Sequence, residues 1–417
     1  MSIIVPSNMV NHSAMVSQPE EQSSYISPGQ RFALLDGLRG VAACIIVAHH
    51  LSEFSPSADH ARQFAPNLMY CIYNHGLFIV HLFLVLGGFG LVMAMPDRPI
   101  SWRKAFSLFG ARYVRLAAPY FVVLIVLILA SRSVLSRGMN PPLIESFSWR
   151  QLFAHLFFLQ DIFGFENLSA GTWYLAIDLQ YVGLFLLIQA SLHTIGAVTK
   201  KDLSGPGAMA TVLVPLGMIS SWYWNRRPDS DVIVFYFLGS LVLGSLVAWT
   251  LLGRISWLVL PIYALTMAAS LTVDFRPRVL VALGASLIIY AGIRFWPKLS
   301  IPRPLLWFGK ISYSLFLIHY LVNGLVLHGL NPWVRSSPPR AFAAMLVAFI
   351  ASLMAASALH SMVEAPCQQW LKSRGKKIGP QSLLHKSAPG FEDCTLTKVE
   401  LSDRIVVANK VRDASTN

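Results

Sequence analysis

The chain has 417 residues, of which 55% are hydrophobic and only 13% are charged. Typical soluble domains carry about 25% charged residues, so this composition excludes an ordinary soluble protein. A formal net charge of +13 is often a sign of nucleic-acid binding. Here the basic residues cluster at the ends of apolar runs, where such residues anchor membrane helices. We therefore expect the lipid bilayer, and no nucleic acid, as the partner of these charges.

Ten apolar runs follow one another along the chain, each near the ~20 residues that a helix needs to cross a bilayer. The runs are continuous rather than alternating, which argues against a membrane β-barrel. The sequence therefore predicts an all-α, polytopic membrane helix bundle of about ten transmembrane helices. The expected spans are 35–51, 72–95, 114–131, 173–196, 208–224, 232–252, 255–272, 278–296, 313–330 and 341–362.

Polar segments flank the transmembrane domain, which we expect over residues 32–371. Residues 1–31 lack the basic-then-apolar pattern of a signal peptide and are predicted to form a disordered cytosolic tail. Residues 372–417, which begin KSRGKK, are predicted to form a polar cytosolic tail. Basic loops follow the second, eighth and tenth spans, which places these loops and both termini in the cytosol. We expect a multi-pass protein, in an endomembrane if the organism is eukaryotic.

The first span carries ionisable residues at both ends, in LLDGLRGVAACIIVAHHL (34–51). Arg39 and His50 are eleven residues apart, which places them on one helix face about 16 Å apart. Asp36 lies one turn before Arg39 and can pair with it or cap the helix. Ionisable groups inside a membrane mark functional paths by default, so His50 is a candidate general base. The alternative is a histidine bonded between helices or lying at the far interface, while His49 points about 100° away and is expected to pack or lie at the interface.

Glycines thin the second span, FLVLGGFGLV (83–92). Gly87, Gly88 and Gly90 allow either a close helix approach or a narrow channel. His81 precedes them in the same span. We expect a packed histidine there, and the alternative is an extra polar group in a cavity.

Two arginines, Arg112 and Arg115, stand at the start of the third span in GARYVRLAAPY (110–120). They are one turn apart at the predicted cytosolic boundary. Two guanidinium groups at this spacing can bind phosphate oxygens. Ordinary anchoring of a membrane helix by basic residues explains the same pattern.

A carboxylate, Asp178, lies within the fourth span in TWYLAIDLQYVGL (172–184). A carboxylate inside a membrane needs a partner, which we expect to be an arginine or a histidine of the bundle. Its role is either structural or catalytic.

The preceding loop, 132–172, contains LFAHLFFLQDIF, which is too short to span and is expected at the interface or over the bundle mouth. The sequon NLS in this loop makes Asn167 a glycosylation candidate.

The last two spans hold further polar residues in FGKISYSLFLIHYLV (308–322) and VEAP (363–366). Ser312 lies near the start of the ninth span, and His319 lies within it. Glu364 follows the tenth span, and we expect it to pair with a cytosolic basic residue. We interpret all three first as structural support.

Taken together, these motifs resemble the acyltransferase 3 family of integral membrane, acyl-CoA-dependent O-acyltransferases, over most of residues 32–366. The first span is similar to the family signature in which an arginine is followed after ten residues by the catalytic histidine, a spacing that Arg39 and His50 fit and His49 does not. GARYVRLAAPY resembles the family's RxxR-L-x-P-x-Y, TWYLAIDLQYVGL its W-S-L-x-x-E with aspartate for glutamate, and FGKISYSLFLIH its L-G-x-I-S-Y-S-L-Y-L-x-H. Gly87 stands where the family usually has serine, and His81 where many members have aspartate, so no role of that serine is carried over.

The resemblance implies acyl transfer from a thioester to a hydroxyl group. It implies that His50 takes the proton of the acceptor hydroxyl and that Arg112 and Arg115 bind the phosphates of acyl-CoA. Arg39, with Asp36, binds a CoA phosphate or orders the mouth of the helix. Acetyl-CoA is the expected co-substrate, with no bound cofactor. A covalent acyl-histidine is the alternative route.

A small hydrophobic acceptor, such as a terpenoid or polyketide alcohol of secondary metabolism, is expected because no esterase-like domain or sugar-binding module accompanies the bundle. A lipid or glycan acceptor is the alternative. A multi-pass transporter without chemistry is the rival class, against which the lack of internal repeats argues. A membrane metalloenzyme would need several histidines at ligand spacing, whereas only one HH pair occurs, at 49–50. We therefore expect no metal.

Overall fold

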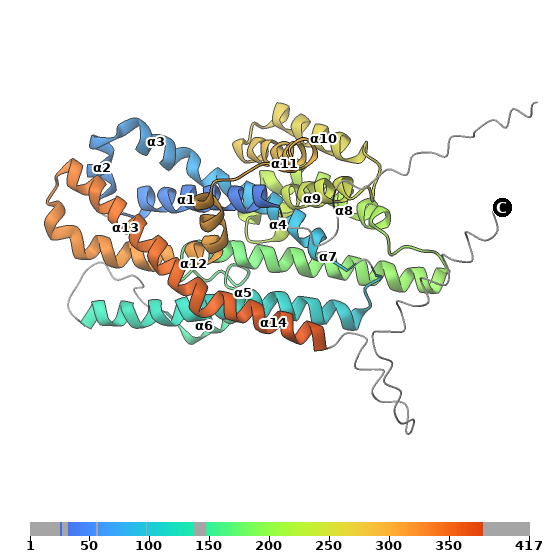
Figure 1. The fold of residues 1–417 in the computed structure, drawn as a ribbon, viewed down its shortest axis with the longest axis horizontal. Helices are drawn as coiled ribbons and strands as arrows, with labels where there is room; N and C mark the ends of the chain where they lie inside the picture. The colour runs from blue at the N-terminus through green and yellow to red at the C-terminus, as the bar shows by residue number, and fades with distance from the viewer. Residues whose placement is uncertain (1–25, 27–31, 56, 97, 137–146, 378–417) are drawn as a thin grey trace, which may run out of the picture. The chain divides into compact units, whose positions relative to one another are not determined.

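The computed structural model describes residue 26 and residues 32–55, 57–96, 98–136 and 147–377 (Figure 1). This part of the chain contains helices and no strand, which confirms the predicted all-α class. The predicted tails lie outside the described residues, except for residue 26 and residues 372–377. The α-helices are α1 (Ala33–Phe54), α2 (Ala58–Phe64), α3 (Pro66–His75), α4 (Val80–Ala94), α5 (Trp102–Ser136), α6 (Trp149–Leu156), α7 (Thr172–Thr199), α8 (Pro206–Trp222), α9 (Val234–Leu251), α10 (Val259–Val273), α11 (Pro277–Phe295), α12 (Arg303–Val334), α13 (Pro338–Leu359) and α14 (Ala365–Lys377).

Eight helical segments in the described residues are long and apolar enough to cross a membrane. They coincide with eight of the ten predicted spans. The other two predicted spans, 208–224 and 255–272, correspond to α8 and α10, which have 17 and 15 residues. At 1.5 Å per residue these helices are about 26 and 23 Å long, somewhat less than the ~30 Å hydrocarbon core. The eight spans are Ala33–Phe54, Pro66–Ala94, Trp102–Ser133, Thr172–Thr199, Val234–Leu251, Pro277–Phe295, Arg303–Val334 and Pro338–Arg374.

The short helices α8 and α10 both pack against α9, the most deeply buried span. The hydroxyl of Tyr263 in α10 donates to the carbonyl of Gly239 in α9 at 3.0 Å, and the N–H of Gly239 donates to Ser220 of α8 at 3.0 Å. A Cβ atom added to Gly217 of α8 would lie 3.2 Å from Val242 of α9, so the two helices run antiparallel. This packing fits the alternating up-and-down arrangement of ten helices.

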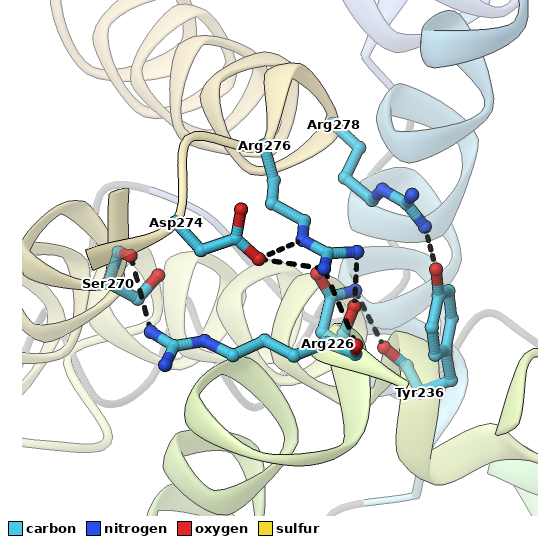
Figure 2. A network of polar contacts seen from close by, with 7 residues as sticks. Arg226, Tyr236, Ser270, Asp274, Arg276 and Arg278 are labelled. Atoms are coloured by element: carbon cyan, nitrogen blue, oxygen red, sulfur yellow. Dashed lines mark hydrogen bonds and ion pairs between the residues drawn. The ribbon is translucent and has the colours of Figure 1, made fainter. Parts of the chain in front are cut away.

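Arginines join the connection between α8 and α9 to the connection between α10 and α11 (Figure 2). Arg276 donates to Asp274 at 2.7 Å and to the carbonyl of Asn225 at 2.9 Å. Arg226 donates to the carbonyl of Ser270 at 3.4 Å. These guanidinium groups form hydrogen bonds within the protein, so we interpret the cluster as structural, holding the two connections together. The same figure shows Arg278 donating to the hydroxyl of Tyr236.

The third membrane helix begins earlier than the sequence predicted. We expected the span 114–131 to follow a basic loop, but α5 starts at Trp102 and is 35 residues long. Arg103 and Lys104 are exposed residues of its first turn. Arginine and lysine are good helix formers, so the helix continues past the apolar stretch. Hydropathy detects only the apolar part of such a helix.

Helices α1 and α12 lie side by side and run in the same direction (Figure 1). A Cβ atom added to Gly40 would lie only 2.6 Å from the carbonyl oxygen of Leu305 and 2.8 Å from the nitrogen of Gly309. Gly309 in turn contacts the backbone of Asp36. Such close contact requires glycine on both helices. It fixes the register that brings His50 to His319, ten residues beyond Gly40 and Gly309 in each helix.

Helices α4 and α9 are also locked by glycines. Gly88 lies against the backbone of Leu241, and Gly244 lies against the backbone of Val85. Gly87 and Gly90 differ: a Cβ atom at Gly87 would meet its nearest neighbour at 3.7 Å, and one at Gly90 would meet only Arg39, at 3.5 Å. Both interpretations of the glycines therefore apply. Gly88 permits close helix packing, whereas Gly87 and Gly90 leave space beside α4.

Candidate active site

His50 and His319 form a buried pair between α1 and α12. Nδ1 of His50 lies 2.7 Å from Nε2 of His319, and the rings are nearly parallel, with centroids 5.0 Å apart. Nδ1 of His319 lies 3.1 Å from the carbonyl oxygen of Leu315, one turn earlier in α12. Only 8% of His50 and none of His319 is exposed. Sequence reasoning singled out each histidine, but nothing in the sequence indicated that they meet.

The hydrogen-bond chain assigns the protons of both imidazole rings. A carbonyl oxygen only accepts, so Nδ1 of His319 carries the hydrogen that it donates to Leu315. Nε2 of His319 is then the acceptor, and Nδ1–H of His50 donates to it. The remaining nitrogen of His50, Nε2, therefore holds a lone pair. This is the tautomer that a general base requires.

His49 belongs to a separate set of contacts. Its Nδ1 lies 3.1 Å from the carbonyl oxygen of Ile72, and its Nε2 lies 3.2 Å from Glu53, one turn later in α1. Its side chain packs against Gly76, where an added Cβ atom would lie 2.8 Å from the Cβ atom of His49. We predicted a packed or interfacial side chain, and His49 is only 4% exposed.

His49, His50 and Glu53 are the residues in the described part of the chain whose potential metal-ligand atoms gather, all within 4.8 Å of one another. The i,i+4 contact of His49 with Glu53 and the His50–His319 bond account for this arrangement without an ion. The expectation that the protein uses no metal stays a prediction.

Arg39 and Asp36 lie at the start of α1, on the face that leads to His50. Nη1 of Arg39 lies 3.7 Å from Oδ1 of Asp36. The arginine side chain is 38% exposed and the aspartate side chain 13%. The guanidinium also lies beside the open face of α4 at Gly90. Arg39 therefore places a positive charge three turns before His50, about 16 Å along α1.

Asp178 and Arg112 form a bidentate ion pair between α7 and α5. Nε of Arg112 donates to Oδ2 at 2.8 Å, and Nη2 donates to Oδ1 at 2.6 Å. The side chain of Asp178 is 8% exposed and that of Arg112 is 30% exposed. The predicted partner of the buried carboxylate is thus an arginine, the same arginine that the sequence assigned to phosphate. Its Nη1 is the nitrogen that the ion pair leaves available for a ligand.

Arg115 lies one turn after Arg112 and is exposed. It interacts electrostatically with Arg112 and Arg39, and with the carboxylates of Glu364 and Asp178. Three arginines from α1 and α5 therefore concentrate positive charge in one region. Such a region suits an anion that carries several phosphate groups.

Glu364, which we predicted to pair with a cytosolic basic residue, interacts electrostatically with Arg115, and its hydrogen bonds are made with α12, its own helical turn and α14. It is 5% exposed and accepts a hydrogen bond from Ser314 at 2.6 Å, with His360 at 3.0 Å and Gln368 at 2.9 Å. The π-helical turn His360–Glu364 directs the carboxylate back toward α12. Ser314 is the serine that binds it.

Ser312 and His81 have local, structural contacts. The hydroxyl of Ser312 donates to the carbonyl of Gly309 within α12 at 2.9 Å. Nδ1 of His81 lies 2.9 Å from the hydroxyl of Ser240 in α9, and its ring packs against Phe237. These contacts agree with a packed His81 and a supporting Ser312.

The segment between α6 and α7 is held by polar contacts. Asn167 is exposed and donates to Asp161 at 2.5 Å. His155, in α6, lies 2.8 Å from the hydroxyl of Tyr120 and 3.3 Å from the carbonyl of Glu166. Burial lowers the pKa of His155 to about 4 and raises the pKa of Asp161. The sequence did not single out His155 or Asp161, because their roles depend on contacts with α5 and with the segment between α6 and α7.

The helical architecture and this arrangement define an integral, multi-pass membrane protein with a buried histidine pair and a cluster of arginines within its bundle. The family description "Acyltransferase domain" matches residues 32–357, which is most of the chain. The chain therefore belongs to the acyltransferase 3 family and is an acyltransferase. No curated protein and no solved structure matches it in the comparisons made.

Proposed function

We propose that the protein transfers an acyl group, acetyl in the first instance, from acyl-CoA to a hydroxyl group of a small hydrophobic acceptor such as a terpenoid or polyketide alcohol. The observation that carries this proposal is the chain from Leu315 through His319 to His50, because it leaves Nε2 of His50 as a base. The arginine cluster supports a polyphosphate donor. The predicted orientation brings acyl-CoA from the cytosolic side, where α1 and α5 begin.

One nitrogen, Nε2 of His50, can carry out both proton transfers of the reaction. Nε2 of His50 takes the proton from the hydroxyl group of the acceptor molecule. At the same time, the oxygen of that hydroxyl group attacks the thioester carbonyl. The tetrahedral intermediate collapses by breaking the carbon–sulfur bond. The CoA thiolate then takes the proton from Nε2 of His50, which yields the ester and free CoA. During the reaction the imidazolium of His50 keeps its Nδ1–H bond to neutral His319, which stabilises the positive charge and holds the ring in place.

Each arginine has a distinct part in donor binding. Arg115, which is exposed, and Arg39, at the mouth of the first span, contact phosphate groups. Arg112 is oriented by Asp178 and offers its remaining Nη1. Because Asp178 neutralises Arg112 in part, Arg115 carries the larger share of phosphate binding.

The test is acyl transfer in membranes that contain the protein, with labelled acetyl-CoA and a panel of terpenoid, polyketide, lipid and sugar alcohols. We expect one class of small alcohols to be esterified by the wild type and by His49→Ala, and none by His50→Ala. His49→Ala is the matched control, because it changes the neighbouring imidazole of the same helix. Full activity of His50→Ala would show that the base has been assigned wrongly.

A further inference from the structure

A cavity of about 140 Å³ opens where the end of α4, the second half of α7 and the end of α9 meet. Val92 and Met95 line it from α4, and Trp249 lines it from α9. The walls are completed by residues that follow α4 and by residues at and before the start of α8: Pro96, Arg98, Pro99, Asp202, Ser204, Gly205 and Pro206. The site assigned so far uses none of these residues.

The cavity contains a buried hydrogen-bond acceptor without a donor. Gln189 of α7 lines it, is 8% exposed, and its Oε1 atom has no hydrogen-bond partner. Leaving a buried polar atom unpaired costs roughly 1–3 kcal/mol, and native proteins seldom do so. The amide oxygen is therefore set to receive an N–H or O–H group from a ligand.

Aromatic rings and positive charges surround this acceptor. Phe185 and Trp249 stack with centroids 5.9 Å apart and an interplanar angle of 28°, and both line the cavity. Arg98 and Arg254 lie at its margin, together with Asp202, whose carboxylate accepts the N–H of Ser204 at 3.1 Å. Aromatic side chains, a hydrogen-bond acceptor and guanidinium groups are features that recognise a purine base with phosphates.

The position of the cavity relates it to the candidate active site. Asp178, Phe185 and Gln189 lie on one face of α7, and Asp178 and Gln189 are eleven residues apart, about 16 Å along the helix. Between them, α4 presents Gly90 and Gly87, the two glycines that leave space beside Arg39 and Asp178. Gly90 lies beside Arg39, and Val92, two residues later on α4, lines the cavity, so the diphosphate next to the adenosine can reach the arginines. His50 lies about 16 Å from Arg39 along α1, which the pantetheine arm of CoA has to span.

We propose that this cavity binds the adenosine phosphate end of acyl-CoA, with the amide oxygen of Gln189 accepting the amino group of adenine. The arrangement places the nucleotide at one end of the glycine face and the thioester at His50. This inference rests on the proposed function, since it assumes that the donor is acyl-CoA. An anionic lipid headgroup would use the arginines but neither the aromatic side chains nor the amide.

The first experiment measures binding without turnover. The phosphorylated ADP moiety of CoA, as a free nucleotide, is titrated calorimetrically into purified wild type, Gln189→Leu and Arg98→Gln. Arg103→Gln is the control, because Arg103 is an exposed arginine outside the cavity. We expect about tenfold weaker nucleotide binding in the two cavity variants and unchanged binding in the control. Equal affinity in all four proteins, or competition by anionic lipid vesicles alone, would overturn the proposal.

The second experiment compares donors that have or lack the nucleotide. For wild type, kcat/KM with acetyl-CoA should exceed kcat/KM with S-acetylpantetheine, and Gln189→Leu should reduce this preference about tenfold. A preference that does not change rejects the cavity while leaving the acyltransferase assignment intact. If the wild type transfers no acyl group from either donor, the proposed function fails, and the calorimetric result still decides whether the cavity binds the nucleotide.

Discussion

At the scale of single residues, the pairing of His50 with His319 predicts a measurable contribution of His319 to catalysis. His319→Ala removes the acceptor of Nδ1–H and should lower kcat by about 10²-fold or more, because general base catalysis of this kind contributes ~10²–10⁴-fold. KM for acetyl-CoA should change little, since His319 is fully buried. His319→Gln, whose amide oxygen can accept the same hydrogen bond, should recover part of kcat. A kcat of His319→Ala near the wild-type value would remove His319 from the mechanism.

The ion pair of Arg112 with Asp178 has a structural and a ligand-binding consequence that can be measured apart. Arg112→Ala leaves a buried carboxylate unpaired, which costs roughly 3–5 kcal/mol in typical buried pairs, so its thermal stability should fall clearly. The double variant Arg112→Ala/Asp178→Asn should regain much of that stability. If its acyl-CoA affinity also returns to the wild-type value, Arg112 acts through folding and does not bind phosphate.

Arg115 offers the contrasting case, because it is exposed and its loss leaves no buried charge. Arg115→Ala should keep the wild-type melting temperature and bind acyl-CoA about tenfold to hundredfold more weakly, the effect of losing a charge-assisted hydrogen bond. Arg115→Lys should recover only part of the affinity, since an ammonium cannot form the bidentate contact. Simple membrane anchoring predicts altered insertion with unchanged affinity in the protein that does insert.

At the scale of elements, adjacent glycines of α4 are predicted to respond in opposite ways to a side chain. Gly88→Ala drives a methyl group into the backbone of Leu241, which cannot move aside as a side chain would, so α4 and α9 should separate. Gly87→Ser restores the serine usual in the family at a position with ordinary van der Waals space. We expect a lower melting temperature or loss of monodisperse protein for Gly88→Ala only. Equal stability of the two variants would contradict the packing of these helices.

The segment between α6 and α7 should loosen in acid because of His155. Burial holds its pKa at about 4, below the ordinary value of 6.5. The unfolded or opened segment binds the proton more readily, so the stability that neutral His155 provides is complete above pH 6.5 and falls as the pH drops from there toward 4. Each pH unit in this window should increase local opening up to about tenfold.

Hydrogen exchange of residues 155–169 at pH 7.5 and pH 5, corrected for the intrinsic rate, measures this opening. His155→Gln, which cannot gain a proton, should show a much smaller dependence on pH. The same dependence in the variant would assign the effect to another group in the segment.

At the scale of the whole molecule, hydropathy and a few motifs predicted the class, the family and most spans. Three features were not predicted, because they depend on contacts between segments far apart in the chain. They are the hydrogen bond between His50 and His319, the ion pair of Asp178 with Arg112, and the burial of Glu364 against Ser314. The early start of α5 was not predicted for another reason, since its first turns are charged while hydropathy detects only apolar residues. The sequence thus indicated candidate residues for the site but not which of them contact one another.

The orientation of the bundle is the last prediction, and it depends on whether the short helix α10 crosses the membrane. Three helices, α9, α10 and α11, separate Asp229 from Lys298, and both residues are exposed. If all three cross, these positions lie on opposite sides, and the basic loop at Lys298 should face the cytosol. In a variant without its native cysteines, Lys298→Cys should therefore react with an impermeant maleimide in sealed microsomes whose cytosolic face is outward. Asp229→Cys should react only after permeabilisation. The reversed pattern would invert the orientation, and labelling of both residues from one side would mean that α10 turns back within the bundle, as its length of 15 residues would allow.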